Sequence, residues 1–127
     1  MNTRATVLVA DVDASTRLLV SSLLKKYNYH VIKGKNGAEA LSLFASHKPS
    51  LIIIDLNMPL LNGCQTSQAI RKMADGDKCT IILFTAEDME TITNQTECLS
   101  VDNIVTKKDI QHLHQLIRTY YESRTDS

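Results

Sequence analysis

The sequence predicts an α/β domain in which a doubly wound parallel sheet is covered by helices on both faces. Five short apolar or β-branched runs alternate with segments of helical periodicity, which is the pattern of βαβ units. The most apolar runs are hydrophobic at successive positions, as in strands that are buried on both faces. The length of 127 residues, with 43% hydrophobic and 22% charged residues, suits one domain with one core.

The predicted strands end at polar side chains. We expect them at Thr6–Ala10, His30–Lys33, Leu51–Ile54, Thr80–Phe84 and Asn103–Thr106. Four are followed at once by a residue that can bind a ligand: Asp11, Asp55, Thr85 and Lys107. Ligands of open α/β sheets bind beyond the carboxyl ends of the strands at a topological switch point. We therefore expect these four side chains in one crevice.

Five helices are expected between and after the strands. The first four are expected at about Ala14–Tyr27, Gly37–His47, Cys64–Met73 and Asp88–Leu99, and the fifth has Asp109 near its start and apolar residues at helical spacing from Ile110 to Tyr120. The first spaces its apolar residues from Leu19 to Tyr27 by three and four, so one stripe should pack on the sheet. Asp13 or Ser15 is expected to cap its first turn.

The second helix carries Ala38, Leu41 and Ala45 on the face that we expect to be buried, and it ends before Pro49. The dipeptide Asn62-Gly63, before the third helix, suits a sharp turn with positive φ. The fourth helix has the weakest pattern, because its threonines and Asn94 lower helix propensity.

The composition narrows the function classes. Fourteen basic and fourteen acidic residues give a formal net charge of zero, which argues against nucleic-acid binding. The three cysteines lack metal-site spacing, so we expect free thiols in a reducing cytoplasm. With no signal-peptide or membrane-spanning pattern, we expect a cytoplasmic protein with no membrane partner. Residues 1–127 are expected to form one domain, with a core over about 6–121 and a short flexible C-terminal tail.

The strand-end residues suit phosphoryl chemistry. Two carboxylates, Asp11 and Asp55, are ligands that Mg²⁺ prefers, together with water and phosphate oxygens. The Lys107 ammonium and the Thr85 hydroxyl could hold two oxygens of a phosphoryl group. An aspartate can also be the nucleophile and form an aspartyl phosphate.

In these segments the chain resembles the receiver domain of bacterial two-component response regulators. The likeness extends over about Thr6–Tyr120 and is most specific where Leu51–Ile54 is followed by Asp55, Asn57-Met58-Pro59 and Asn62-Gly63. Supporting segments are Val7–Asp11, Ser15-Thr16-Arg17, Asn36–Leu41, Thr85-Ala86-Glu87 and Lys107. The resemblance implies a flavodoxin-like, CheY-like (βα)5 fold with strand order 2-1-3-4-5.

The resemblance also implies roles for the site residues. Asp55 would accept a phosphoryl group from a sensor histidine kinase or a phosphotransfer protein. Mg²⁺ would be bound by Asp11, by Asp55 and by the backbone carbonyl of Asn57. Thr85 and Lys107 would contact the phosphoryl oxygens. A downstream protein or output domain would bind the face of the fourth helix, fifth strand and fifth helix. The chain would be a phosphoacceptor signalling domain rather than an enzyme, with at most self-catalysed phosphotransfer and dephosphorylation.

Three residues depart from the family pattern. Val12 stands where the family has an acid that binds the metal directly, which would weaken metal binding unless Asp13 turns inward. Ile104 replaces an aromatic ring that moves with the threonine. Lys108 replaces a proline after the lysine, so we expect a trans Lys107-Lys108 peptide, because a cis bond without proline costs about 2.5–4 kcal/mol.

Three functions remain open from the sequence. The first is a receiver that is phosphorylated on Asp55 in a phosphorelay. The second is a pseudo-receiver, a protein-interaction module independent of phosphorylation, which Val12, Ile104 and Lys108 favour. The third is a small Mg²⁺-dependent phosphatase, which would need a second acid where Asn57 stands.

Overall fold

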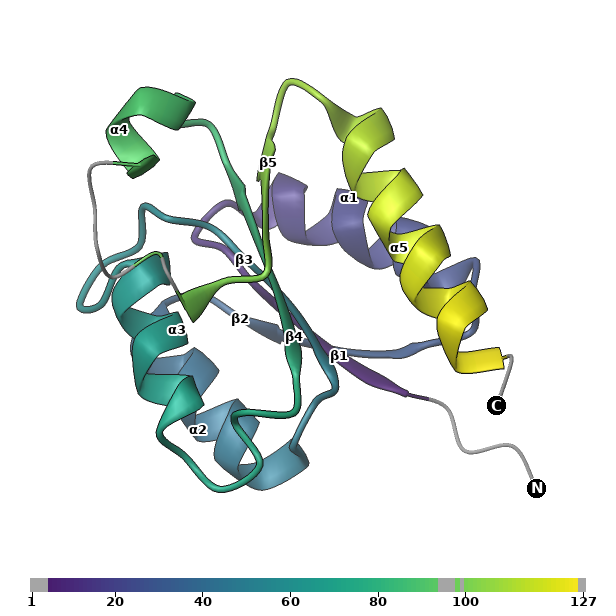
Figure 1. Ribbon diagram of the computed structural model, residues 1–127, viewed down its shortest axis with the longest axis horizontal. Helices are drawn as coiled ribbons and strands as arrows, with labels where there is room; N and C mark the ends of the chain where they lie inside the picture. Colours follow the sequence, from purple (N-terminus) through teal and green to yellow (C-terminus); the bar gives the residue numbers. More distant parts are fainter. Residues whose placement is uncertain (1–4, 94–97, 99, 126–127) are drawn as a thin grey trace.

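The structure is a computed structural model, and it describes residues 5–93, 98 and 100–125. Strands and helices alternate along the chain (Figure 1). In order they are β1 Thr6–Ala10, α1 Ala14–Lys25, β2 His30–Gly34, α2 Gly37–His47, β3 Leu51–Ile54, α3 Gly63–Arg71, β4 Thr80–Thr85, α4 Met89–Thr93, β5 Asn103–Thr106 and α5 Ile110–Thr125. The predicted strands differ from these by at most one residue at an end.

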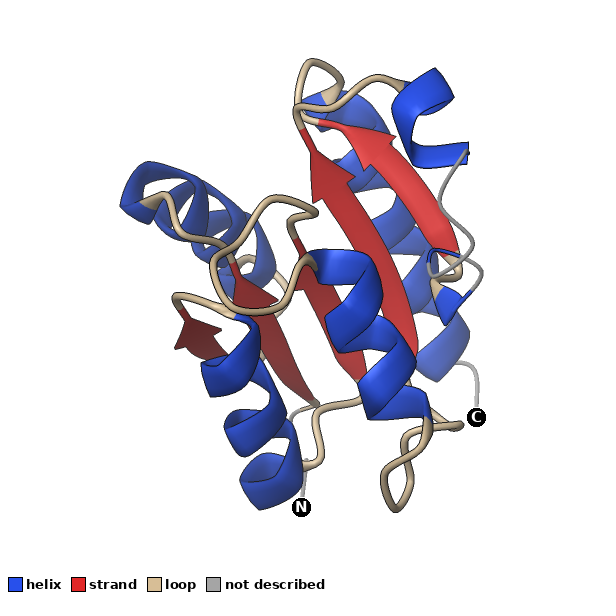
Figure 2. Ribbon diagram, turned by 90° about the vertical axis from the view of Figure 1, so that its left-hand side faces the viewer, coloured by secondary structure: helices blue, strands red, loops and turns tan. Residues whose placement is uncertain are grey.

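The strands form one parallel five-stranded sheet in the order β2-β1-β3-β4-β5. Helices α1 and α5 cover one face, and α2, α3 and α4 lie on the other (Figures 1 and 2). Both the α/β class and the strand order are confirmed. The order places β1 and β3 side by side at the centre, so the residues that follow these two strands are neighbours.

The sheet divides the core into two layers. Alternate residues of β3 point to opposite faces, so Leu51 and Ile53 pack with α1 and α5, while Ile52 and Ile54 pack with α2 and α3. All four are at most 2% exposed. Burial on both faces explains why this strand is hydrophobic at every position.

Two of the predicted helix faces are wrong in detail. On α2, Ala38 and Ala45 are exposed, and the buried residues are Gly37, Ala40 and Phe44. The buried stripe of α2 lies one residue earlier than predicted. Phe44 has a larger apolar side chain than either alanine, so its burial in the core is favoured. On α1, Val20 and Leu24 are fully buried as predicted, but Leu19 is 47% exposed.

The prediction of a positive φ at Asn62-Gly63 is also wrong. Asn62 is an extended N-cap that forms a capping box with Gln65, and the described glycines all have negative φ. The positive φ of this loop falls on Leu60, at 75°. Gly63 is needed for space, since a Cβ there would lie 2.8 Å from the Asp55 carbonyl carbon.

Helix α4 is described over the first part of the predicted Asp88–Leu99. The structure confirms a helix over Met89–Thr93, which Asp88 begins by accepting a hydrogen bond from the Thr91 backbone N–H (2.7 Å). Residues 94–97 and 99 of the predicted helix lie outside the described residues. Cys98 and Ser100 lie in 3₁₀ turns.

The expectation of three free thiols is corrected for two cysteines. Cys64, in the first turn of α3, forms a disulfide with Cys98, and Cys79 is a free buried thiol. The pairing partners are 34 residues apart in sequence. Sequence spacing could not indicate this pairing, because it depends on both segments packing on the same face of the sheet.

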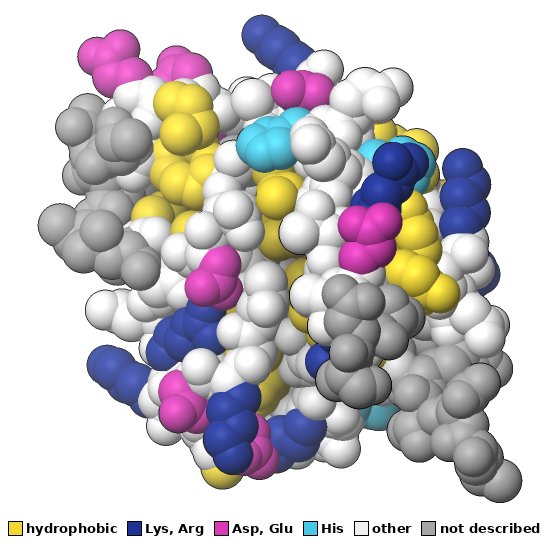
Figure 3. All heavy atoms as spheres, turned by 45° about the vertical axis from the view of Figure 1, so that its right-hand side comes forward, with side chains coloured by type: hydrophobic (Ala, Val, Ile, Leu, Met, Phe, Trp, Pro, Cys, Tyr) yellow, Lys and Arg dark blue, Asp and Glu magenta, His cyan; other side chains and the backbone are white. Residues whose placement is uncertain are grey.

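Surface charge is mixed in sign. On the face of Figure 3, basic and acidic side chains are interspersed, as the net charge of zero suggests. Among the helices in the described part of the chain, none is long and apolar enough to cross a membrane.

Candidate functional site

The predicted strand-end residues meet at one edge of the sheet. Asp11 follows β1, Asp55 follows β3, Thr85 is the last residue of β4, and Lys107 follows β5. Backbone hydrogen bonds continue the pairing past the strands, from Asp55 N–H to the Ala10 carbonyl (3.0 Å) and from Lys107 N–H to the Thr85 carbonyl (2.8 Å). The sheet thereby fixes the backbone from which each of these side chains projects.

Lys107 joins the two aspartates. Its Nζ lies 2.8 Å from Asp11 Oδ2 and 3.2 Å from Asp55 Oδ2. The side chains of Asp11 and Asp55 are only 3% and 8% exposed, whereas that of Lys107 is 21% exposed. A buried carboxylate without a partner is costly, so one ammonium shared by two carboxylates stabilises this arrangement.

Burial and charge act in opposite directions on the site's acid–base groups. Burial raises the pKa of Asp11, and the hydrogen bonds from Lys107 and from the Asp13 N–H oppose that rise. For Lys107, burial alone would lower the pKa, but the hydrogen bond to Asp11 and the charge of Asp55 together raise it above its usual value. Lys107 is therefore a cation throughout the physiological range.

Asp55 keeps one oxygen for a ligand. Its Oδ1 atom is buried and has no hydrogen-bond partner in the described part of the chain. An unpaired buried carboxylate oxygen is costly and calls for a metal, water or phosphoryl partner. Asp55 is therefore the site residue with an oxygen available for binding or for attack.

The residues present fit a Mg²⁺ ion that keeps several waters. No cluster of three or more His, Cys, Asp and Glu side chains in the described residues could hold a metal. Mg²⁺ needs only one or two carboxylates with water and phosphate oxygens. Asp11, Asp55 and the Asn57 backbone carbonyl would be its protein ligands.

Val12 and Asp13 do not add to that set. Val12 is 54% exposed. Both Asp13 oxygens are engaged at the start of α1, where Oδ1 accepts from the Ser15 N–H (3.0 Å) and Oδ2 from the Thr16 hydroxyl (3.1 Å). The predicted capping role of Asp13 is confirmed, and the cap uses the oxygens that a substitute metal ligand would need.

The loops after β3 and β4 are tied together over the site. Asn57 Nδ2 donates to Glu87 Oε1 (2.7 Å), and the Glu87 backbone N–H donates to Thr85 Oγ1 (3.2 Å). The contact between Glu87 and Asn57 was not predicted from the sequence. The signal was the strand order, because β3 and β4 are neighbours and their following loops must meet.

The two other departures lie on β5 and just beyond it. Ile104 pairs in register with Leu83 and is partly buried against the α2–α3 layer. Lys108 is exposed, its N–H donates to Thr106 Oγ1 (2.9 Å), and the Lys107-Lys108 peptide is trans as predicted. With a trans peptide, Lys107 still reaches both aspartates.

Comparison with known proteins gives a consistent result. The family profile of the response regulator receiver domain matches residues 7–118. Protein PilH of Pseudomonas aeruginosa is 30% identical over 87 residues, which cover 68% of this chain and 72% of that protein. Response regulator RR06 of Streptococcus pneumoniae is 32% identical over 120 residues, covering 91% of this chain and 54% of that protein.

A solved structure supports the fold. The chemotaxis response regulator CheY4 of Vibrio cholerae superposes with a TM-score of 0.78 at 25% identity, covering 91% of this chain and 99% of that one. Several similar proteins are longer, and the chain spans 34–46% of the length of two probable transcriptional regulators, ycf27 of Porphyra purpurea and of Porphyridium aerugineum.

Proposed function

The chain belongs to the response regulator receiver domain family of two-component signalling, and we propose that it acts by accepting a phosphoryl group on Asp55. The donor is a sensor histidine kinase or a phosphotransfer protein. One observation carries the proposal: a single ammonium, Lys107 Nζ, lies within 3.2 Å of two buried carboxylates, and Asp55 Oδ1 has no hydrogen-bond partner among the described residues.

The chemistry follows from these contacts. An Asp55 oxygen attacks phosphorus, the new P–O bond forms as the bond to the donor nitrogen or acyl oxygen breaks, and the donor leaves with that electron pair. Asp55 Oδ1 can attack phosphorus while Oδ2 keeps the hydrogen bond that it accepts from Lys107 Nζ. A carboxylate oxygen is the nucleophile in this step.

Phosphoryl transfer is accelerated mostly by positioning and by charge neutralisation. Mg²⁺, when bound by Asp11, Asp55 and the Asn57 carbonyl, supplies positive charge for the phosphoryl oxygens. Lys107, which follows β5, supplies a second positive charge. Thr85 is fully buried at the end of β4, and its Oγ1 accepts a hydrogen bond from the Glu87 N–H. We propose that the same hydroxyl donates its hydrogen to a phosphoryl oxygen.

The phosphoryl group would act as a switch by changing the populations of two conformations. Thr85 and Lys107 connect the site to β4 and β5, whose pairing continues to Thr85 and Thr106. The proposed output surface is therefore the face of α4, β5 and α5, which includes Met89, 46% exposed. A downstream protein or output domain would bind there.

The test compares two aspartates that lie close together in the fold. The protein is incubated with a small acyl phosphate and Mg²⁺, and the intact mass is measured. Asp55→Asn should abolish the phosphoryl adduct. Asp13→Asn, which keeps an N-cap side chain, should retain it. An adduct that persists in folded Asp55→Asn would refute the acceptor assignment.

A further inference from the structure

Cys64 and Cys98 lie together on the face of the sheet that α2, α3 and α4 cover. Their Cα atoms are 4.6 Å apart, within the range of 4.4–6.8 Å that a disulfide requires. Both belong to the buried cluster that includes Ile92 of α4. Two thiols placed in this way can be joined or separated without moving the backbone by several ångström.

The pair connects two functionally distinct segments. Cys64 follows Gly63, whose N–H donates to the Leu56 carbonyl (2.8 Å) in the loop that carries the acceptor aspartate. Cys98 lies between α4 and β5 in the sequence, and its carbonyl accepts a hydrogen bond from the Val101 N–H (3.4 Å). A bond between them ties the start of α3 to the chain that leaves α4.

We propose that the Cys64–Cys98 pair is a reversible redox link that restrains α4 when it is oxidised and releases it when it is reduced. Within the described part of α4, Ile92 is the buried residue that anchors the helix to the core. A covalent bond at Cys98, which follows α4 in the sequence, would limit the freedom of that helix. Opening the bond would restore that freedom.

The effect should be confined to α4, because β5 has its own attachment to α3. Arg71 donates to the Ser100 carbonyl (2.9 Å) and forms an ion pair with Asp102 (2.8 Å). Asp102 Oδ2 also accepts from the Ile81 N–H (2.8 Å). These contacts contain no sulfur and persist in both redox states, so β5 stays in place.

The oxidant is a small disulfide such as oxidised glutathione. A thiolate of the pair attacks one glutathione sulfur, forming a mixed disulfide and releasing one glutathione. The second thiolate then attacks the protein sulfur of that mixed disulfide and releases the other glutathione. The two cysteines lose two electrons, oxidised glutathione gains them, and the two thiol protons finish on the two glutathione molecules. Cys98 is 7% exposed and Cys64 is 0% exposed, so Cys98 is the residue that reacts first with oxidised glutathione.

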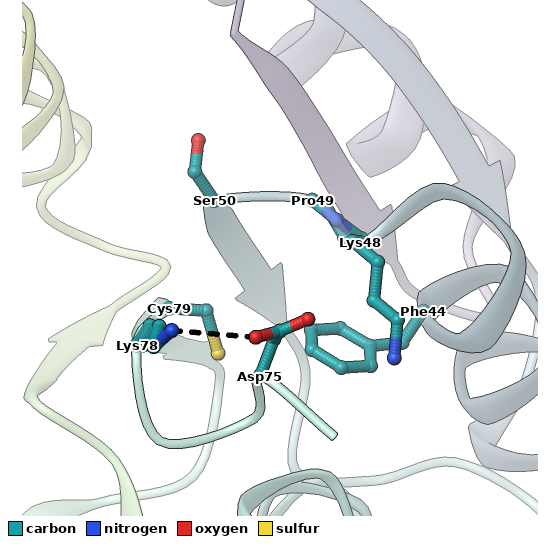
Figure 4. Close-up of a pocket in the computed structure, with 7 residues that line it drawn as sticks. All are labelled: Phe44, Lys48, Pro49, Ser50, Asp75, Lys78 and Cys79. Carbon is teal, nitrogen blue, oxygen red and sulfur yellow. Dashed lines mark ion pairs between the residues drawn. The ribbon is translucent and has the colours of Figure 1, made fainter. Parts of the chain in front are cut away.

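Cys79 provides an internal control. It belongs to the same buried cluster as the pair but lines a pocket at the amino ends of β3 and β4, beside Phe44, Ser50 and the Lys78–Asp75 ion pair (Figure 4). Burial raises the pKa of its thiol, and its Sγ contacts the Gly76 carbonyl (3.3 Å). Like Cys98 it is nearly buried, at 6% exposed, but it is unpaired.

The experiment has two readouts. After equilibration in oxidised or reduced glutathione, the protein is acid-quenched, unfolded and alkylated, and its thiols are counted by intact mass. Of the three cysteines, one should be alkylated in the oxidised protein and three in the reduced protein. Hydrogen exchange is measured in parallel, and amides of residues 89–93 should exchange faster after reduction while those of β5 do not change.

Two matched variants sharpen the result. Cys98→Ser should abolish the redox dependence of both readouts, and Cys79→Ser should keep it. Three alkylated thiols in folded oxidised protein, or a disulfide that leaves α4 exchange unchanged, would overturn the proposal. Any effect of the link on partner binding rests on the output surface proposed above for α4, β5 and α5, but the thiol count and the hydrogen exchange need no phosphorylation. A failure of Asp55 as acceptor would therefore be seen separately.

Discussion

Replacing Gly63 by alanine should destabilise the fold and damage the site together. An added Cβ would lie 2.8 Å from the Asp55 carbonyl carbon and 2.9 Å from Leu83 Cδ1, and closer still to the Asp55 carbonyl oxygen. These separations are 0.5–0.6 Å below the 3.4 Å at which ordinary contacts begin. The nearest atoms are backbone atoms of Asp55, so no side-chain rotation relieves the overlap.

The magnitude follows from opposing terms. Overpacking of a buried position costs about 1–3 kcal/mol, and contact with backbone points to the upper half of this range. Alanine recovers up to about 1 kcal/mol, because glycine has lower helix propensity and more freedom in the unfolded chain. The net expectation is a loss of about 2 kcal/mol in the free energy of unfolding, or about 6–8 °C in Tm for a domain of this size.

Gly34→Ala is the matched control. A Cβ at Gly34 would meet its nearest atoms at 3.5 Å, an ordinary contact distance, and the φ of Gly34 is not positive. That variant should be as stable as the parent or slightly more stable. Thermal and urea unfolding would be measured for both, with phosphoryl adduct formation as the second assay. If Gly63→Ala unfolds at the same midpoint as Gly34→Ala and accepts phosphate normally, close packing against Asp55 is not why glycine is there.

Three further predictions concern single side chains. Val12→Asp should tighten Mg²⁺ binding by about tenfold, since affinity rises with the number of carboxylate ligands. Calorimetry measures the affinity, with Val12→Asn as the control. An affinity no higher than that of Val12→Asn would mean that Val12 does not limit Mg²⁺ affinity. Lys107→Met leaves Asp11 without its cation and raises the pKa of Asp11 further. The variant should lose about 3 kcal/mol in the free energy of unfolding at pH 8, and less at pH 5 because the Asp11 carboxyl takes up a proton as the pH falls. Urea unfolding that gives the same loss at both pH values would contradict this. Burial raises the pKa of Tyr29 to about 12 from 10.0, so the parent should lose stability as the pH rises from 10 to 12, where the unfolded phenol ionises first. Tyr29→Phe should lose less over that interval and be no less stable at pH 7, because the Tyr29 hydroxyl is buried without a hydrogen-bond partner in the described structure; equal pH dependence in the two proteins would rule out Tyr29 as its source.

The strands and the site residues could be predicted because each rests on a short stretch of sequence. Leu51–Ile54 is apolar at every position since both faces of β3 are buried, and its abrupt end at Asp55 marks the sheet edge. Once the sheet is parallel, its geometry brings the strand ends together. The convergence of Asp11, Asp55 and Lys107 followed from this rule alone.

The features that were missed depend on which segments meet in space. The α2 stripe was placed one residue late because two similar stripes compete, and the volume of Phe44 decides between them. Position 63 requires glycine because the Asp55 backbone leaves no room for a Cβ, and not because the turn needs a positive φ. The Cys64–Cys98 pairing and the contact of Asn57 with Glu87 both cross between loops, where sequence periodicity carries no signal.

The most direct test of the central claim is the metal dependence of phosphorylation at Asp55. The unmodified protein is incubated with a small acyl phosphate in Mg²⁺ or in EDTA, and the intact mass is followed over time beside Asp55→Asn. We predict an adduct that requires both Mg²⁺ and Asp55, because Asp11, Asp55 and the Asn57 carbonyl suffice for the ion despite Val12. Absence of any adduct from protein shown to be folded would contradict this account and indicate an interaction module that works without phosphorylation.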